Sequence, residues 1–475
     1  MKVLLIRPHI SLKVAKRLRA FLHLEPLALE IVAGGIGPCH EVRILDLASE
    51  KRPFRLFTSV LESFRPDLTG LTGYSNQAKT VERLAAEAKK ILPESMVITG
   101  GIHATVAPQY YRHCRDIDLI VRGEGATAMK RLLPLLENGE PLPEDDVFIP
   151  VGSPSFQQLS ELPPPELPQY SEVPPPRRDL VDRSRYFCIW HGERNEKMPA
   201  LFPPTAAMRT SVGCPNRCNF CVVHYLAGGK YRQRTPEEVV TEIASIPENH
   251  IYFVDDEMFI NAKRCERIAR LLIERGIEKK YVSWARADTI CRHPKLFRLW
   301  KEAGLSLLYV GLESMEAKTL DGFNKGIEPD VNRGAVELLR DIGIGLHAAF
   351  MVRPEFDDDD FLRLRQAVDY VAPAEVTFTV FSPSPGTPLW EEHRDAFICP
   401  DPYAFYDCFH TILPTKLPLK KFYARFAQLY LFSVRNNPWR RNKVKVPKKD
   451  LLRFLCGGAR YGISLKRIYR DYRDF

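Results

Sequence analysis

The stretch MRTSVGCPNRCNFC at residues 208–221 places three cysteines within eight positions. Cys214, Cys218 and Cys221 have the spacing Cys-x3-Cys-x2-Cys and follow a run, residues 206–211, that predicts a strand. Three thiolates on one tight loop can bind three irons of a cubane 4Fe–4S cluster and leave the fourth iron without a protein ligand. The alternative is a structural zinc site, which usually takes four ligands in paired Cys-x2-Cys units, and no matching second pair follows. The stretch therefore predicts a cluster-binding loop at the end of a strand.

Five further β-rich runs follow the cysteines, and helical patterns at residues 236–246, 262–275 and 331–342 separate some of them. This alternation indicates a full or partial parallel barrel whose site lies at the carboxyl ends of its strands. We expect these strands at residues 251–254, 281–285, 306–311, 345–351 and 376–381.

A second alternating series precedes the cysteines, in residues 1–150. It begins with MKVLLIRPHI, which reads as a buried first strand rather than as a signal peptide. Alternating β and α units of this length favour an open, doubly wound parallel sheet with helices on both faces. We expect its strands at residues 3–7, 41–46, 68–72, 96–100 and 119–122.

Residues 161–178 separate the two series, and seven of these eighteen residues are proline. Such a segment forms neither a helix nor a central strand, so it predicts a linker. The expected organisation is an α/β chain of four parts: a first domain at residues 1–150, a Pro-rich linker at 151–200, a barrel core at 201–415 and a basic helical extension at 416–475.

The composition is that of a globular protein, with 45% hydrophobic and 27% charged residues. The net charge of +9 is modest for 475 residues and selects neither nucleic acid nor a membrane as partner. No apolar run reaches the 18 residues or so that a membrane span needs. Eleven cysteines with one tight cluster fit a reducing compartment. We therefore expect a cytoplasmic protein, with any membrane contact peripheral and at the inner face.

The cysteine loop and the two series resemble those of cobalamin-dependent radical S-adenosylmethionine (SAM) enzymes. Residues 1–150 resemble the cobalamin-binding domain of that class and residues 200–400 its radical core. The resemblance implies one 4Fe–4S cluster with three cysteine ligands, SAM as cosubstrate on the exchangeable fourth iron, and cobalamin. In the first domain it rests on LEPLALEIVAG (24–34), LTGYSN (71–76), TGGIHATVAP (99–108) and VRGEGATAM (121–129).

Within the core, the resemblance implies cofactor-binding roles for residues after successive strands. Phe220 would pack against the adenine, and the acidic turn 255–257, with Asp256 and Glu257, would receive the ammonium group of SAM. A helix N-cap is the alternative for this turn. Arg286 would lie near the SAM carboxylate, or else form a plain surface ion pair, and Glu313 would bind the ribose or methionine part.

Three other core features carry weaker signals. Lys325 is expected to be a solvated helix-end charge, and His347 on the fifth strand points either inward or into the core, most often a structural role. FSPSPGTPLW (381–390) matches the family's sixth-strand loop, in which Gly386 fixes a turn.

In the first domain, Gly100, Gly101 and His103 are the candidates to contact the nucleotide tail of cobalamin. The Asp-x-His-x-x-Gly loop, whose histidine ligates cobalt in many cobalamin proteins, is absent from the sequence. The lower cobalt face therefore has no nameable ligand. A degenerate domain that merely supports the core is the alternative.

Within the class, the resemblance is greatest to the hopanoid C-3 methylases, on LHLEPLALEIVAG (22–34), FSPSPGTPLW and HTILPTKLPLKKFYARF (410–426). It implies methylation of an unactivated carbon, C-3 of ring A, through methylcobalamin and a 5′-deoxyadenosyl radical, with no side-chain general base and with a flavodoxin or ferredoxin as electron donor. A methylase or cyclase acting on another lipid, a tetrapyrrole or a natural product is the first alternative. A non-catalytic metal-stabilised scaffold or RNA-binding module is another, although no nucleic acid partner is expected.

The extension contains an amphipathic segment, residues 420–435, followed by the basic run PWRRNKVKVPKK (438–449). Aromatic and basic residues together suit a membrane interface, where a triterpenoid substrate would be met. Packing of the same helix on the barrel, with solvated charges, is the equal alternative. The stripe consists of Phe422, Phe426, Leu429, Tyr430 and Phe432.

Overall fold

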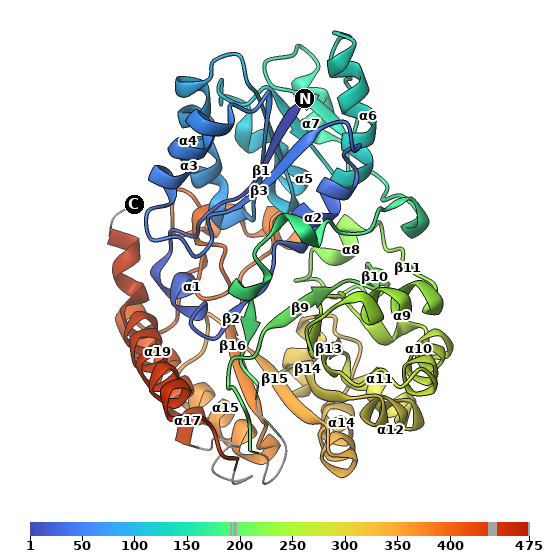
Figure 1. Ribbon diagram of the computed structural model, residues 1–475. Coiled ribbons are helices and arrows are strands. Elements are labelled where there is room, and N and C mark those ends of the chain that lie inside the picture. The colour runs from blue at the N-terminus through green and yellow to red at the C-terminus, as the bar shows by residue number, and fades with distance from the viewer. Residues whose placement is uncertain (191, 193–196, 436–443, 474–475) are drawn as a thin grey trace.

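A computed structural model describes residues 1–190, 192, 197–435 and 444–473, with two six-stranded sheets one above the other (Figure 1). The upper sheet has the strand order β3-β1-β4-β5-β6-β7, and all of its pairs are parallel except that of β6 with β7. The order reverses between β1 and β4, which in a doubly wound sheet opens a ligand crevice at the carboxyl ends. Its strands are β1 (Lys2–Arg7), β3 (Glu41–Asp46), β4 (Leu68–Thr72), β5 (Met96–Gly100), β6 (Leu119–Val121) and β7 (Phe148–Pro150).

Helices cover both faces of this sheet, as expected. One apolar cluster joins the sheet to α3 and α4, and a second joins the opposite face to α2 and α6. The helices of this half are α2 (Leu27–Gly34), α3 (Pro53–Phe64), α4 (Ala78–Ile91), α5 (Ile102–Val106), α6 (Gly125–Glu137) and α7 (Phe156–Glu161).

The lower sheet is a partial barrel of six parallel strands in the order β16-β15-β14-β13-β12-β9, so β9 and β16 are its edges. The expected strands are confirmed within a few residues at each end. They are β9 (Thr205–Met208), β12 (His250–Phe253), β13 (Lys280–Ala285), β14 (Leu305–Glu313), β15 (Gly345–Val352) and β16 (Glu375–Val380).

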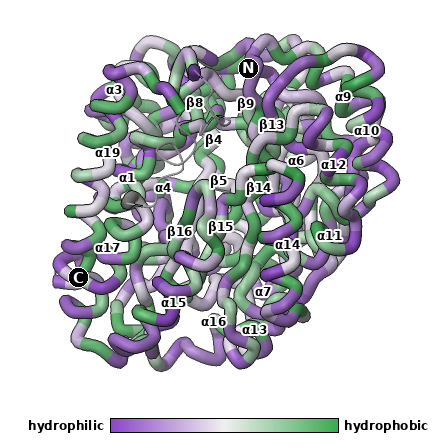
Figure 2. The backbone as a smooth tube through the Cα atoms, turned by 90° about the horizontal axis from the view of Figure 1, so that it is seen from below, coloured by the Kyte–Doolittle hydropathy of each residue, from purple (hydrophilic) through white to green (hydrophobic). Residues whose placement is uncertain are grey.

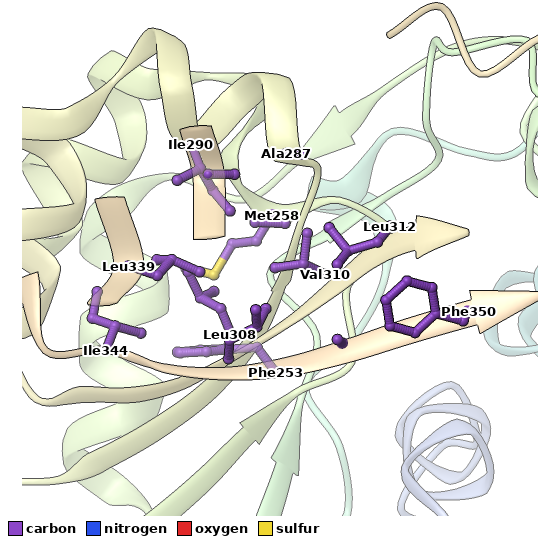
Figure 3. Close-up of a cluster of buried hydrophobic side chains, with 14 of the residues drawn as sticks. Phe253, Met258, Ala287, Ile290, Leu308, Val310, Leu312, Leu339, Ile344 and Phe350 are labelled. Atoms are coloured by element: carbon purple, nitrogen blue, oxygen red, sulfur yellow. The ribbon is translucent and has the colours of Figure 1, made fainter. Parts of the chain in front are cut away.

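The main core lies between this sheet and its outer helices, because alternate strand residues point outward. Figure 3 shows Phe253 and Leu308 from the strands close to Met258 and Leu339 from the covering layer. The covering helices are α9 (Pro236–Ser245), α10 (Ala262–Glu274), α11 (Ala287–Arg292), α12 (Pro294–Glu302), α13 (Ala317–Gly322), α14 (Pro329–Ile342) and α15 (Asp358–Val371). The other alternate residues face the lumen of the partial barrel.

The linker forms no long element, as its prolines predict, and after α7 ends at Glu161 only short 3₁₀ turns occur within residues 162–180. The chain does, however, connect the two halves in a way that the sequence did not indicate. Near its start it leaves the upper sheet, forms α1 (Lys13–Leu18) and then β2 (Leu22–His23), which pairs with β8 (Phe187–Cys188) beside the barrel.

The C-terminal extension consists of α17 (Leu419–Arg435) and α19 (Lys448–Arg467), which pack against each other and, through α19, against α1. Figure 2 shows these three helices together at one side of the molecule. The aromatic stripe of α17 is not a membrane-facing surface, because Phe422 and Phe426 are fully buried and Tyr430 donates a 2.7 Å hydrogen bond to the carbonyl of Phe378. Packing on the barrel is therefore the correct interpretation of this helix. In the basic run 438–449, residues 438–443 lie outside the described part.

Among the described residues, no helix is both long enough and apolar enough to cross a membrane. The remaining short strands and α-helices of the described residues are β10 (Ser211–Val212), β11 (Arg232–Gln233), α8 (Val223–Leu226) and α16 (Pro388–Glu392).

Candidate active site

The three cysteines lie on the loop that follows β9, between β10 and α8, and none forms a disulfide. The amide of Asn216 donates a 3.2 Å hydrogen bond to the Cys214 sulfur. Burial raises the pKa of Cys221 to about 11, and the neighbouring sulfurs of Cys218 and Cys214 add to this effect. The thiols are thus gathered in one partly buried loop, where a metal must displace their protons to bind.

Two members of the acidic turn hold this loop in place. Asp255, which is fully buried, accepts hydrogen bonds from the backbone N–H (3.1 Å) and hydroxyl (2.7 Å) of Thr210. Asp256 accepts a 2.8 Å bond from the backbone N–H of Gly213, the residue before Cys214. The hydrogen bonds of Asp255 and Asp256 therefore go to the cysteine loop. Supporting this loop is a different role from the two that the sequence suggested, which were binding of SAM and capping of a helix.

Glu257 differs from its two neighbours, because its Oε1 is buried and has no hydrogen-bond partner among the described residues. Burial raises the pKa of this carboxyl to about 8, against the attraction of nearby Arg286. A buried acceptor that receives no hydrogen bond destabilises the folded protein, unless a bound ligand donates one to it. Of the three acids, Glu257 is therefore the one that the geometry leaves available to a cationic group.

Arg286, directly after β13, connects the cysteine loop with the rest of the barrel edge. Its Nη1 lies 3.6 Å from the sulfur of Cys218, while Nε donates to Asp288 at 2.9 Å and Nη2 to the carbonyl of Lys325 at 2.8 Å. It is not a surface ion pair, because its side chain is only 11% exposed. The guanidinium lies where it can act on a cluster ligand.

Glu313 ends β14 at a bulge, with a positive φ of 59°, and its Oε1 lies 3.0 Å from Nζ of Lys325. The prediction that Lys325 is a solvated charge is wrong, because the residue is buried and paired with Glu313. Phe220 packs edge-on against Phe323 at 5.4 Å between ring centroids. Phe220 belongs to the cysteine loop itself, so this contact joins the loop to the segment that follows α13.

At the carboxyl edge of the upper sheet, Gly100 is the last residue of β5, and Gly101 lies between β5 and α5. Gly101 has φ +88°, and a Cβ there would lie 2.5 Å from the hydroxyl of Thr72, so only glycine fits. His103 is fully buried, with its Nδ1 3.2 Å from the Ser75 hydroxyl, and burial lowers its pKa to about 3. The two glycines are at the edge itself, whereas His103 lies beneath it.

Tyr74 is a residue of this edge that sequence reasoning missed. It follows β4 at the point where the strand order reverses, and it is 63% exposed although it is a large aromatic side chain. The available signal was an aromatic residue directly after a buried strand, within the segment LTGYSN.

The carboxyl edges of the two sheets face each other. Val106, after β5, lies 2.8 Å from the position of a Cβ at Gly386, after β16. His103 packs edge-on against Tyr403 at 5.1 Å between centroids. Ligands bound at the two edges would therefore meet between the sheets, with loops from both halves around them.

The lumen of the barrel presents aromatic side chains that the sequence did not single out. The ring centroids of Trp284 and Tyr309 are 3.7 Å apart, and those of Tyr309 and His347 are 4.4 Å apart. His347 therefore points inward, where its Nδ1 lies 2.7 Å from Glu375 and its Nε2 lies 2.7 Å from the hydroxyl of Thr377. The result is a continuous aromatic wall that ends in a polar group.

Comparisons with known proteins agree with this architecture. The family description "Radical SAM superfamily" matches residues 208–368, and "B12 binding domain" matches residues 18–133. The chain is 31% identical to the hopanoid C-3 methylase of Methylococcus capsulatus over 415 residues, which cover 86% of this chain and 76% of that protein. It is 27% identical to an uncharacterised methyltransferase of Pyrococcus horikoshii, over 77% of this chain and 78% of that one.

Among solved structures, the radical SAM methyltransferase TsrM from Kitasatospora setae, with cobalamin and a [4Fe–4S] cluster bound, has a similar fold. The TM-score is 0.63 at 16% identity, and the match covers 99% of both chains. The whole described architecture, both sheets included, therefore occurs in a known fold.

Proposed function

Because the chain belongs to the cobalamin-dependent radical SAM methyltransferases, we propose that it methylates a hopanoid at C-3 of ring A. The observation that carries the proposal is the 31% identity with a hopanoid C-3 methylase across 86% of the chain. The enzyme uses a 4Fe–4S cluster, SAM and cobalamin, as its family does. A reductant of the flavodoxin or ferredoxin type would supply electrons.

The residues of the barrel edge fit a cluster and SAM. Three free thiols on one loop are a donor set for three irons of a cubane. We propose Cys214, Cys218 and Cys221 as the ligands, with Glu257 receiving the ammonium group and Arg286 beside the cluster. Bound there, the cluster and SAM would supply a radical able to remove a hydrogen atom from an unactivated carbon.

The edge of the upper sheet fits cobalamin, which would supply the methyl group. The turn at Gly100 and Gly101 is tight, because a Cβ at Gly101 would meet the hydroxyl of Thr72, and Tyr74 offers an exposed aromatic face beside it. We propose these three residues as cobalamin contacts. His103 would act from beneath by holding Ser75 and the neighbouring tyrosines in position.

The lumen supports a large apolar substrate. Flat aromatic faces at Trp284 and Tyr309 suit a fused-ring hydrocarbon, since apolar pockets with few polar groups bind such ligands. The polar end at His347 and Glu375 would fix the orientation of the bound molecule. The role of the protein is then to position one ring carbon between the two carboxyl edges and to exclude water.

The test is expression in a hopanoid-producing host that makes no 3-methylhopanoids, followed by lipid profiling by mass spectrometry. We expect a hopanoid heavier by one methyl group, with the substituent on ring A. The variant with Cys214→Ala, Cys218→Ala and Cys221→Ala should give no such product. Methylation elsewhere on the hopanoid, or of a tetrapyrrole instead, would overturn the substrate assignment.

A further inference from the structure

Helix α19 is held to the molecule by one of its faces. Phe454 packs edge-on against Phe21 at 5.6 Å between centroids, and Tyr461 packs against Tyr430 at 5.5 Å. Leu465, one turn further along, is fully buried. Residues at this spacing lie on one side of a helix, so the inner face of α19 is fixed against α1 and α17.

The opposite side of α19 is apolar as well, although it faces solvent. Leu452, Leu455 and Ile463 are 64%, 54% and 52% exposed, and helical periodicity places them together, away from the inner face. Leu431 of α17, 61% exposed, continues the surface, because its Cδ2 lies 3.9 Å from the position of a Cβ at Gly462. We call these four side chains the outward face.

Basic residues lie at both ends of the outward face. Lys448 and Lys449 are exposed in the first turn of α19, and Lys466 and Arg467 are exposed in the last. The helix contains six basic residues and a single acidic one, Asp450. That carboxylate is engaged elsewhere, since it accepts a 2.9 Å hydrogen bond from the backbone N–H of Leu201.

We propose that the outward face of α19 docks the enzyme onto an anionic membrane surface, with the helix axis in the plane of the membrane. This inference deepens the proposed function, on which it rests for its purpose: access to a membrane-resident substrate. Both views place α19 at the outer edge of the molecule, where a planar surface can reach it (Figures 1 and 2).

The basic residues at both ends of α19 favour a membrane over a protein as the partner of the outward face. A stripe of aliphatic side chains about 17 Å long, on a helix about 30 Å long with cationic groups at both ends, is the pattern of an interfacial helix. The long basic side chains can extend to lipid phosphates while the leucines and the isoleucine enter the acyl boundary. The aromatic stripe of α17, in contrast, is buried against the barrel, so α19 and not α17 presents an apolar surface to solvent.

The test is flotation of the full-length reconstituted enzyme with vesicles of phosphatidylglycerol and phosphatidylcholine, and with vesicles of phosphatidylcholine alone. We expect binding to the anionic vesicles that weakens with added salt. Replacement of two aliphatic residues, Leu452→Ser with Leu455→Ser, should lower the partition coefficient by about tenfold or more. Reversal of charge with Lys448→Glu and Lys449→Glu should lower it by a similar factor on anionic vesicles only.

The matched controls are Ile273→Ser and Lys263→Glu on α10, an exposed aliphatic and an exposed basic residue of another helix. Both should bind vesicles within about twofold of the parent. Equal binding by the α19 variants and the parent would overturn the proposal, as would a dimer in light scattering that Leu452→Ser with Leu455→Ser converts to a monomer. Methylation of a detergent-dispersed hopanoid is measured separately, so the substrate assignment and the docking surface can fail independently.

Discussion

Arg209 and Glu124 form an ion pair across the two sheets, with 3.3 Å between Nη2 and Oε2. Arg209 follows β9 and Glu124 follows β6, so each residue comes from the carboxyl edge of its own sheet. Arg209 also contacts the hydroxyl of Tyr170 in the Pro-rich linker, at 3.3 Å from Nε. Both sheets and the linker between them therefore converge on one guanidinium close to the cysteine loop.

Removal of this contact should loosen the alignment of the two edges. We expect the Arg209→Met variant to cleave SAM but to make fewer methylated products for each SAM cleaved, by a factor on the order of tenfold. The reason is that misplacement of about 1 Å is enough to slow a reaction that depends on positioning. The ratio of 5′-deoxyadenosine to methylated product measures this. The matched control is Arg267→Met, which removes an exposed ion pair with Glu237 on the outside of the barrel. An unchanged ratio in Arg209→Met would contradict the positioning role.

Arg286 should tune the cluster electronically. Its guanidinium lies 3.6 Å from the Cys218 sulfur, and a nearby cation stabilises the more negative, reduced state of a cluster. We expect Arg286→Gln to shift the midpoint potential to a more negative value in a redox titration followed by EPR. Arg292→Gln is the control, because Arg292 pairs with the same Asp288 at 2.5 Å but is 61% exposed. Identical potentials in the two variants would count against the assignment.

Gly101 should be irreplaceable at the cobalamin edge. A methyl group at this position would lie 2.5 Å from the Thr72 hydroxyl, with φ at +88°. We expect Gly101→Ala to cost roughly 1–3 kcal/mol and to lower the amount of cobalamin retained per chain. Gly139→Ala is the control, because Gly139 has φ +67° but no atom in the described part of the chain lies within 4 Å of its added Cβ. Full cobalamin retention by Gly101→Ala would exclude this turn from the binding site.

His410 makes stability depend on pH. Its Nδ1 lies 3.0 Å from Asp407 and its Nε2 3.2 Å from Asp471, and although burial opposes the charge, these carboxylates raise the pKa to about 9. The folded pKa exceeds the unfolded value of 6.5, so the stabilisation is complete below pH 6.5 and is lost as the pH rises to 9 and beyond.

The expected loss is roughly 2–3 kcal/mol between pH 6 and pH 9.5, measured by chemical denaturation. His410→Gln cannot take up the proton, so the free energy of unfolding of this variant should vary less across the same range. If parent and variant lose stability in parallel, another group is responsible.

Both sheets could be predicted because their strands alternate with helices in simple order, and because the cysteines directly follow a strand. The roles of α17 and α19 could not be predicted, because an apolar stripe at helical spacing fits packing on the barrel and contact with a membrane equally well. Phe422 was buried by contacts with residues 60 or so positions earlier, such as Phe361, which no local pattern reveals.

Prediction of the site from the sequence had the same limit, since local patterns do not show contacts between distant segments. The cysteine loop and Arg286 could be found from motif order, whereas the burial of Lys325 depends on the bulge in β14 that brings Glu313 to it. The lumen residues Trp284 and Tyr309 were not found because an alternating strand has two faces, and only the curvature of the sheet turns one of these faces toward the lumen.

The crossing of α1 and β2 to the barrel side has a consequence for protein engineering. Ala20 and Phe21 pack against Gly457 of α19, and β2 pairs with β8 in the second half of the linker, so segments from near the start and near the end of the chain share one scaffold. Removal of residues 1–150 as a cobalamin-binding module would also remove α1 and β2. Helix α19 would then lose its contacts with α1. Swapping modules between relatives would therefore require the first 25 or so residues and the last helix to be exchanged together.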